Sequence, residues 1–312
     1  MSNSIDTGYL LDMLRWQRPE GSVAQQVFCE HYLEPVFGLP DKYGNYILTI
    51  LNEDGSFPEV CFTAHHDTVH FTGGFQTVEV ALDMAYTPDG DCLGADCTTG
   101  IFIIMEMIDA LVPGQYVIHG GEELGCVGSG GIIVSNPDWL SKVNSVISFD
   151  RYGVESLVTH QMGYRTCSDE FADSLIDILG IGLVKDTTGV YTDSNEYRDD
   201  VPECTNIAVG YNKQHSKYET QDLDYLRVLI PALIEADWSK LVIKRDPKVV
   251  NLKEGKSATA EEIKLAIEKT QIENLLFDHT EEMADYLHYI GYTAEELRIE
   301  LGLAKGEKLC TN

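Results

Sequence analysis

The stretch Ala64-His65-His66-Asp67-Thr68-Val69 follows the apolar run Pro58-Glu59-Val60-Cys61-Phe62-Thr63, and the rest of the chain is organised around this junction. The run is typical of a buried strand, and two histidines and a carboxylate stand where that strand ends. Buried polar groups without partners cost free energy, so such side chains at a strand end indicate binding. Successive strand residues point to opposite faces, so we expect His65 and Asp67 on one face and His66 on the other.

His65 and Asp67 fit the pattern of a metal ligand and its supporting carboxylate. A metal-bound histidine commonly donates its second N–H to a carboxylate, which fixes the tautomer and raises the basicity of the ring. The pattern therefore favours His65 as a ligand with Asp67 behind it. We expect His66 to pack against the protein or to cap an element.

Strand and helix patterns alternate up to about residue 240. The apolar runs predict strands at 46–51, 58–65, 78–82, 116–119, 143–150, 156–161 and 206–210. Helical spacing predicts helices at 5–18, 22–36, 101–108, 168–179 and 221–238. Residues 52–56 indicate a hairpin-like turn between the first two strands. The alternation predicts an α/β fold, a three-layer sandwich with a central mixed, mostly parallel sheet flanked by helices.

Polar side chains stand at five separate strand or loop ends. They are His65, Asp96, the pair Glu122-Glu123, Asp150 and His215. In parallel sheets, binding sites form outside the carboxyl ends of the strands, so we expect these side chains to cluster. Two other interpretations stay open: Asp96 as the N-cap of the helix that follows it, and the glutamate pair as a solvated surface loop.

The chain has 312 residues and a net charge of −29. So acidic a surface repels phosphates and anionic lipids, which excludes nucleic acid and membranes as primary partners and favours cationic substrates or metal ions. We expect neither a signal peptide nor a membrane span. The eight cysteines are scattered without a Cys-x-x-Cys pair, which is typical of reduced thiols in a cytoplasmic protein.

The composition changes near Arg245-Asp246-Pro247-Lys248. We therefore expect a catalytic domain at 1–245 and a helical C-terminal extension at 246–312. Thr259–Glu262 and Thr293–Glu296 both match a helix-capping box. The extension is expected to pack on the core or to mediate assembly of a homo-oligomer.

Taken together, the five groups resemble the co-catalytic di-zinc exopeptidases, namely the M28 aminopeptidases and the related M20 and M42 groups. The resemblance covers about residues 40–240, and it rests on the order of the motifs: His-x-Asp, an Asp before a buried helix, Glu-Glu, an Asp at a strand end, and a late His followed by Ser-x-x-Glu. Asp150-Arg151 departs from the usual pattern of the family, and the role of Arg151 stays open.

The resemblance implies a role for each position. His65 would bind one metal with Asp67 as its partner, Asp96 would bridge both metals, and Glu122 would be the general base. Glu123 and Asp150 would be ligands of different metals, and His215 would complete the site. Two Zn²⁺ ions are implied, and the same donors also suit Mn²⁺ or Co²⁺.

Several other residues are secondary candidates. A hydroxyl from Tyr211 or Tyr197 could assist the reaction. The remaining candidates are His119 and His160 as pocket residues, Asp193 and Glu196 as substrate contacts, and Glu219 and Thr220 as caps of the following helix.

The number of residues between Asp150 and His215 distinguishes the groups of this superfamily. The separation is 65 residues (215 − 150), too few for the lid domain that the M20 enzymes carry there. The resemblance therefore favours an aminopeptidase acting on peptides or small amides. Two alternatives stay open: a related metal-dependent amidohydrolase or carboxypeptidase on a non-standard amide, and an inactive homologue that serves as a binding module.

Overall fold

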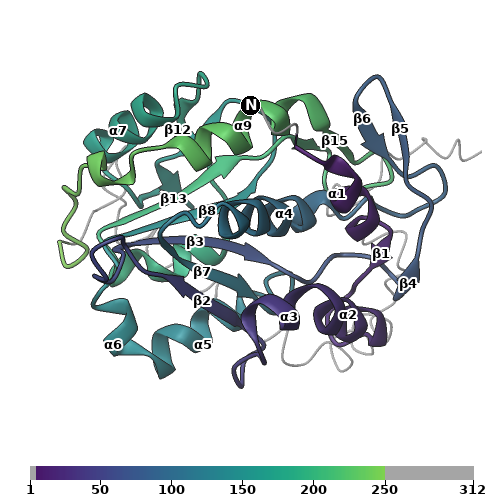
Figure 1. Cartoon of the computed structure of the whole chain (residues 1–312), viewed down its shortest axis with the longest axis horizontal. Coiled ribbons are helices and arrows are strands. Elements are labelled where there is room, and N and C mark those ends of the chain that lie inside the picture. Colours follow the sequence, from purple (N-terminus) through teal and green to yellow (C-terminus); the bar gives the residue numbers. More distant parts are fainter. Residues whose placement is uncertain (1–4, 250–312) are drawn as a thin grey trace, which may run out of the picture. The chain divides into compact units, whose positions relative to one another are not determined.

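The computed structural model describes residues 5–249 of the chain. The expected extension at 246–312 lies outside the described residues, apart from 246–249. Within the described part, a central sheet has the strand order β12-β9-β13-β8-β3-β7-β2 (Figure 1). The strands are β2 (Tyr46–Ile50), β3 (Val60–His65), β7 (Gly114–His119), β8 (Ser145–Arg151), β9 (Ser156–Val158), β12 (Val184–Asp186) and β13 (Glu203–Ala208).

The middle of this sheet is parallel. Strands β13, β8, β3 and β7 run in one direction, while β2 is antiparallel to β7 and β9 is antiparallel to β13. The prediction of a mixed, mostly parallel sheet is therefore confirmed. The predicted turn at 52–56 forms, with the backbone N–H of Asn52 donating to the Ser56 carbonyl. The prediction that it joins a hairpin is wrong, because β7 lies between β2 and β3.

Side chains of the central strands alternate between two apolar cores. Phe62 and Ala64 of β3 belong to the larger core, whereas Cys61 belongs to the smaller one. Strand β7 divides in the same way, with Tyr116 on one side and Val117 on the other. This alternation follows from the two-residue period of a strand, and it explains why the strands are apolar throughout.

Helices cover both faces of the sheet (Figure 1). The larger core includes residues of α1 (Thr7–Met13), α2 (Val23–Phe28), α4 (Ala95–Asp109), α7 (Asp169–Leu179) and α9 (Leu223–Glu235). The smaller core includes residues of α5 (Val127–Ser135) and α6 (Pro137–Leu140), and α8 (Asp193–Glu196) packs against α5. The three-layer arrangement is thus present.

The N-terminal helices are shorter than predicted. Helix α1 ends at Met13, because Trp16–Gln17 forms β1 and pairs with β4 (Gly74–Phe75). The predicted helix at 22–36 comprises α2, a π-helical turn at Cys29–Leu33 and α3 (Glu34–Phe37). Helix α5 was not predicted.

Besides the pair of β1 and β4, two smaller sheets complete the described part. One has the order β14-β15-β6-β5 and joins Tyr211–Asn212, Thr220–Asp222, Met84–Tyr86 and Glu79–Ala81. The other pairs β10 (His160–Gln161) with β11 (Tyr164–Arg165). In the first of these sheets, β15 pairs with β6, which joins the segment after the His215 loop to the hairpin of β5 and β6.

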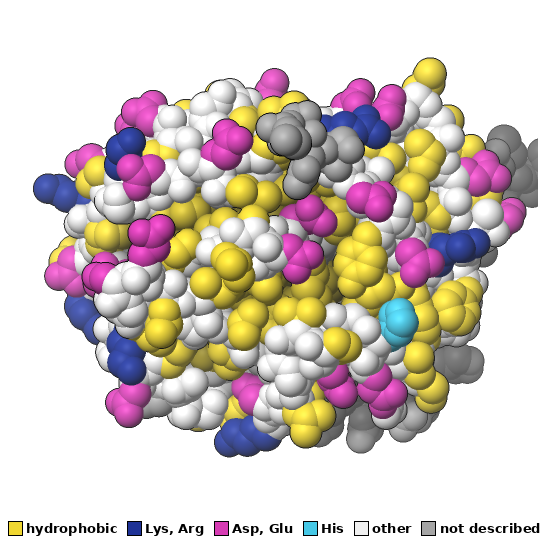
Figure 2. Space-filling view, viewed as in Figure 1, with side chains coloured by type: hydrophobic (Ala, Val, Ile, Leu, Met, Phe, Trp, Pro, Cys, Tyr) yellow, Lys and Arg dark blue, Asp and Glu magenta, His cyan; other side chains and the backbone are white. Residues whose placement is uncertain are grey.

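Acidic side chains are spread over the face shown in Figure 2, with lysine and arginine side chains between them. They do not gather into one patch in this view. No helix among the described residues is both long and apolar enough to cross a bilayer.

Candidate metal centre and adjoining cavity

His65 stands at the carboxyl end of β3, directly beside β7. The two strands are parallel, and His65 pairs with His119, the last residue of β7. The loop that follows His119 therefore begins next to His65 and brings Glu122 and Glu123 to the same edge of the sheet. His65 is buried.

Asp67 links His65 to this glutamate loop. Its Oδ1 lies 3.4 Å from His65 Nδ1, and its two oxygens accept hydrogen bonds from the backbone N–H of Glu122 (3.1 Å) and Glu123 (2.9 Å). Burial acts to raise the pKa of Asp67, but the hydrogen bond and charge of His65 outweigh it and hold the pKa at about 2. Asp67 thus stays ionised and positions a histidine and two glutamates together.

Asp96 lies between two histidines. Its Oδ1 is 3.0 Å from His65 Nε2, and its Oδ2 is 3.2 Å from His215 Nε2. Each carboxylate oxygen therefore faces a different imidazole, as a carboxylate that bridges two metal ions must. Asp96 is not the N-cap of α4, since Gly94 holds that position and both Asp96 oxygens face histidine rings.

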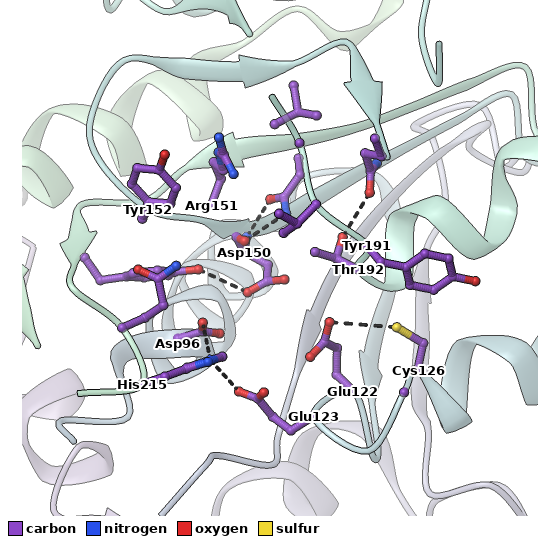
Figure 3. Close-up of a pocket in the computed structure, with 18 residues that line it drawn as sticks. Asp96, Glu122, Glu123, Cys126, Asp150, Arg151, Tyr152, Tyr191, Thr192 and His215 are labelled. Carbon is purple, nitrogen blue, oxygen red and sulfur yellow. Dashed lines mark hydrogen bonds and ion pairs between the residues drawn. The ribbon is translucent and has the colours of Figure 1, made fainter. Parts of the chain in front are cut away.

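One further carboxylate lies beside each histidine. Asp150 Oδ1 is 3.5 Å from His65 Nε2, and Glu123 Oε1 is 3.1 Å from His215 Nε2. All five predicted ligand positions thus come together, and Asp96 contacts the histidine of both groups. Figure 3 shows Asp96, Glu123, Asp150 and His215 at the edge of the cavity.

The donor set fits a pair of metal ions. Imidazole nitrogens and carboxylate oxygens are ligands that zinc takes in proteins. Glu123 Oε1 is buried, and its neighbour His215 Nε2 at 3.1 Å lies outside hydrogen-bond geometry, so the oxygen is free to bind a cation. Burial raises the pKa of Asp150 to about 7, with a further contribution from the charge of Asp96. Crowded carboxylates of this kind need a positive partner in order to ionise together.

The close packing of α4 against β8 sets the distance between Asp96 and Asp150. A Cβ atom on Gly100 of α4 would lie 2.5 Å from Cys97 Sγ and 2.9 Å from Ala64 Cβ, and closer still to the carbonyl oxygen of Phe149. Only glycine lets the helix approach the strand this far. Gly100 therefore brings Asp96, four residues earlier, to the end of β8.

Glu122 lies beside the ligands but pairs with none of them. Its Oε1 accepts a weak hydrogen bond from Cys126 Sγ at 3.8 Å. Burial raises the pKa of Glu122 well above its usual value, although the charge of His65 opposes this shift. A carboxylate with a raised pKa can both take up and release a proton near neutral pH.

A cavity of about 320 Å³ opens from the ligands (Figure 3). Tyr211 lines it and donates a hydrogen bond to Asp150 Oδ1 at 3.2 Å, whereas Tyr197 is buried against His119. The lining consists of Asp96, Glu122, Glu123, Gly125, Cys126, Asp150, Arg151, Tyr152, Val158, Gln161, Gly189, Val190, Tyr191, Thr192, Asn206, Tyr211, Gln214 and His215.

Several secondary candidates lie outside this lining. His66 is buried between Gln25 and the Gly44 carbonyl, and His119 contacts Asn45 through Nδ1. The other residues expected near the substrate and absent from the described lining are His160, Asp193, Glu196 and Tyr197.

Glu219 has a role that the sequence did not reveal. It is not a helix cap, because Asp222 caps α9. Its buried carboxylate instead accepts hydrogen bonds from the backbone N–H of Leu93 (2.9 Å), Gly94 (2.9 Å) and Asp96 (3.1 Å). Glu219 thus joins the loop that carries Asp96 to the loop that carries His215. Only the Ser-x-x-Glu sequence after His215 hinted at it.

Comparison with known proteins identifies a family whose sequence pattern this chain matches. The model of peptidase family M28 matches residues 45–201 of the chain, which include every ligand position above except His215. No curated protein matches the sequence.

Solved structures with a similar fold include three peptidases. Aminopeptidase PepT from Bacillus cereus is 14% identical with a TM-score of 0.58, and the match covers 73% of this chain and 96% of that one. A tripeptidase from Staphylococcus aureus is 15% identical with a TM-score of 0.58, over 73% and 95% of the two chains. The TET1 peptidase of Pyrococcus horikoshii is 16% identical with a TM-score of 0.52, over 73% and 99%. At these identities the likeness establishes the fold.

Proposed function

Because this chain belongs to peptidase family M28, we propose that it is a zinc-dependent exopeptidase, specifically an aminopeptidase that removes a residue from the free amino end of a peptide or small amide. One observation carries the proposal: the Asp96 carboxylate has one oxygen at His65 and the other at His215. This arrangement matches the bridging ligand of a two-metal site.

We assign the ligands to two groups. His65 and Asp150 would hold one ion, Glu123 and His215 would hold the other, and Asp96 would belong to both. Two Zn²⁺ ions, when bound, would polarise the scissile carbonyl group and lower the pKa of water. Mn²⁺ or Co²⁺ would suit the same donors.

Glu122 would act as the general base and then as the general acid. Its carboxylate would take a proton from the attacking water and deliver it to the leaving amine. The raised pKa of Glu122 supports this exchange, because protonated and ionised forms are then both accessible. Asp67 would orient His65 and hold the backbone of Glu122, which keeps the base at a fixed distance from the ligands.

The proposal is tested by metal content together with substrate choice. Elemental mass spectrometry of the purified full chain should give about two transition-metal ions per chain. Hydrolysis should occur with free-amine aminoacyl amides and not with their N-blocked forms. Cleavage of only blocked or C-terminal substrates would favour an amidohydrolase or carboxypeptidase. Absence of both metal and turnover after reconstitution would favour a binding module.

We further propose a cytoplasmic location and self-association. The described cysteines are all unpaired and buried, which suits a reducing compartment.

The proposal of self-association has two supports. The TET1 peptidase assembles into a tetrahedron or an octahedral shell, and Phe71, Phe75 and Leu82 expose large apolar surfaces in this chain. Light scattering after size exclusion would measure the oligomer. We also propose, from the sequence, that residues 246–312 form a separate helical extension.

A further inference from the structure

We propose that the cavity beside the metal centre selects substrates whose N-terminal residue has a side-chain carboxylate or carboxamide, and that Arg151 makes this selection. The inference rests on the aminopeptidase function proposed above. Arg151 follows the ligand Asp150, lines the cavity and is 5% exposed. In Figure 3, Arg151 and Tyr152 lie on the opposite side of Asp150 from Asp96 and His215.

The guanidinium group of Arg151 is fixed by four neighbours. Nη2 donates to Asp186 Oδ2 (2.7 Å) and Thr188 Oγ1 (3.1 Å), and Nε donates to Ser156 Oγ (3.4 Å). The group also stacks on the ring of Tyr152, 4.3 Å from its centre. A guanidinium held in this way loses little conformational freedom when a ligand binds.

Nη1 of Arg151 is the part that these neighbours leave free. Among the described residues it has no hydrogen-bond acceptor, yet it is not sealed from solvent. Because Arg151 lines the cavity, Nη1 is the donor left to bind an acceptor on a substrate. An apolar side chain would displace water from these donors without replacing its hydrogen bonds, which is unfavourable.

The charged residues around the cavity support the same selectivity. All four acidic lining residues, Asp96, Glu122, Glu123 and Asp150, belong to the proposed metal centre. Arg151 is the one permanently charged cation among the described lining residues. A lysine or arginine side chain of a substrate carries only donors, so it would find no acceptor at Arg151. The acidic balance of the whole chain, which favours cationic partners, is therefore not continued on this wall.

Asp186 explains why a carboxamide should bind as well as a carboxylate. Burial acts to raise the pKa of Asp186, but hydrogen bonds from Ser156, Thr188 and Arg151 outweigh it and keep the pKa below its usual value. The ionised Asp186 offsets the charge of Arg151. Arg151 then offers the substrate directed donors with little net charge, and both kinds of acceptor satisfy them.

The test compares four substrates, namely the N-terminal Glu, Gln, Leu and Lys 4-nitroanilides, with the metal-loaded full chain. We expect kcat/KM for Glu and Gln to exceed that for Leu and Lys. Arg151→Met should lower the Gln-to-Leu ratio by about 10–100-fold, the range for a lost hydrogen bond to a charged group. Asp186→Asn should raise the Glu-to-Gln ratio, since the charge of Arg151 is then no longer offset. Wild-type preference for Leu or Lys would overturn the inference while leaving the peptidase function intact.

Calorimetric binding of the free amino acids L-Glu, L-Gln, L-Leu and L-Lys gives a readout that needs no turnover. Tighter binding of Glu and Gln, lost in Arg151→Met, would support the inference even if the proposed peptidase activity fails. Equal binding of all four, or binding of none, would overturn it. Because Arg151→Met leaves Asp186 unpaired, unfolding curves of each variant are measured first, and Arg151→Lys, which keeps the charge without the forked donors, serves if Arg151→Met does not fold.

Discussion

Replacing Gly100 by alanine places a methyl group where α4 meets the end of β8. The added Cβ would lie 2.5 Å from Cys97 Sγ and 2.9 Å from Ala64 Cβ, whereas ordinary contacts are 3.4–4 Å. The nearest obstacle is the backbone carbonyl of Phe149, which cannot rotate away. Relief therefore requires α4 to move away from the sheet, and Asp96 would move with it.

The size of the effect follows from two opposing terms. An extra methyl group in a packed interior costs about 1–3 kcal/mol, and alanine is favoured over glycine inside a helix by about 1 kcal/mol. Since backbone must move here, we take the upper part of the first range and expect a net loss of about 2 kcal/mol in the free energy of unfolding. A displacement of about 1 Å at a site can cost about 100-fold, so zinc affinity should fall as well.

Gly130 offers a matched control. It lies within α5, and a Cβ there would meet only Glu196 Oε2, at 3.8 Å. Gly130→Ala should therefore stabilise the protein by about 0.5–1 kcal/mol. Urea unfolding of the metal-free chain and zinc titration against a chromophoric chelator would measure both variants. If Gly100→Ala matched Gly130→Ala in stability and kept wild-type zinc affinity, the argument that close approach of α4 builds the site would fail.

Three further predictions concern the metal centre. Glu122→Gln should retain metal and lose about 10²–10⁴-fold in kcat, and wild-type turnover would remove Glu122 as the base. Glu219→Gln should weaken zinc binding in the chelator assay. Glu203→Gln, which alters a buried carboxylate at the amino end of β13, should not. Equal effects would reduce Glu219 to a general stabiliser. In the metal-free protein, hydrogen bonding to Asp96 raises the pKa of His215 to about 11. Zinc must displace that proton, so below pH 11 the zinc affinity should rise about tenfold per pH unit for each proton released. Calorimetry in buffers of different ionisation enthalpy would detect the proton release. A zinc affinity that does not change with pH would contradict this prediction.

The sequence predicts those parts of the fold and site that depend on short segments. The apolar run before His65 and the apolar residues after Asp96 are local patterns, and both elements form where they were expected. The position of β7 between β2 and β3 is not local, because a turn after Ile50 is compatible with either neighbour.

The features that the sequence did not predict depend on tertiary packing. Helix α5 has three glycines, which suggest a loop, but a Cβ on Gly128 would overlap the backbone of Gly120, and one on Gly131 would overlap the ring of Tyr43. Close packing thus overrides helix propensity there. Glu219 meets Asp96 across more than a hundred residues, so no local pattern could have revealed that contact.

The small sheet of β14, β15, β6 and β5 has a consequence for the order in which a growing chain can mature. Strand β6 precedes Asp96, yet its partner β15 is made more than a hundred residues later. His215 and Glu219 emerge from the ribosome in the same late segment. A nascent chain that stops short of β15 would therefore lack the hydrogen bonds that join Glu219 to the start of α4, and loading with metal should follow synthesis of this segment.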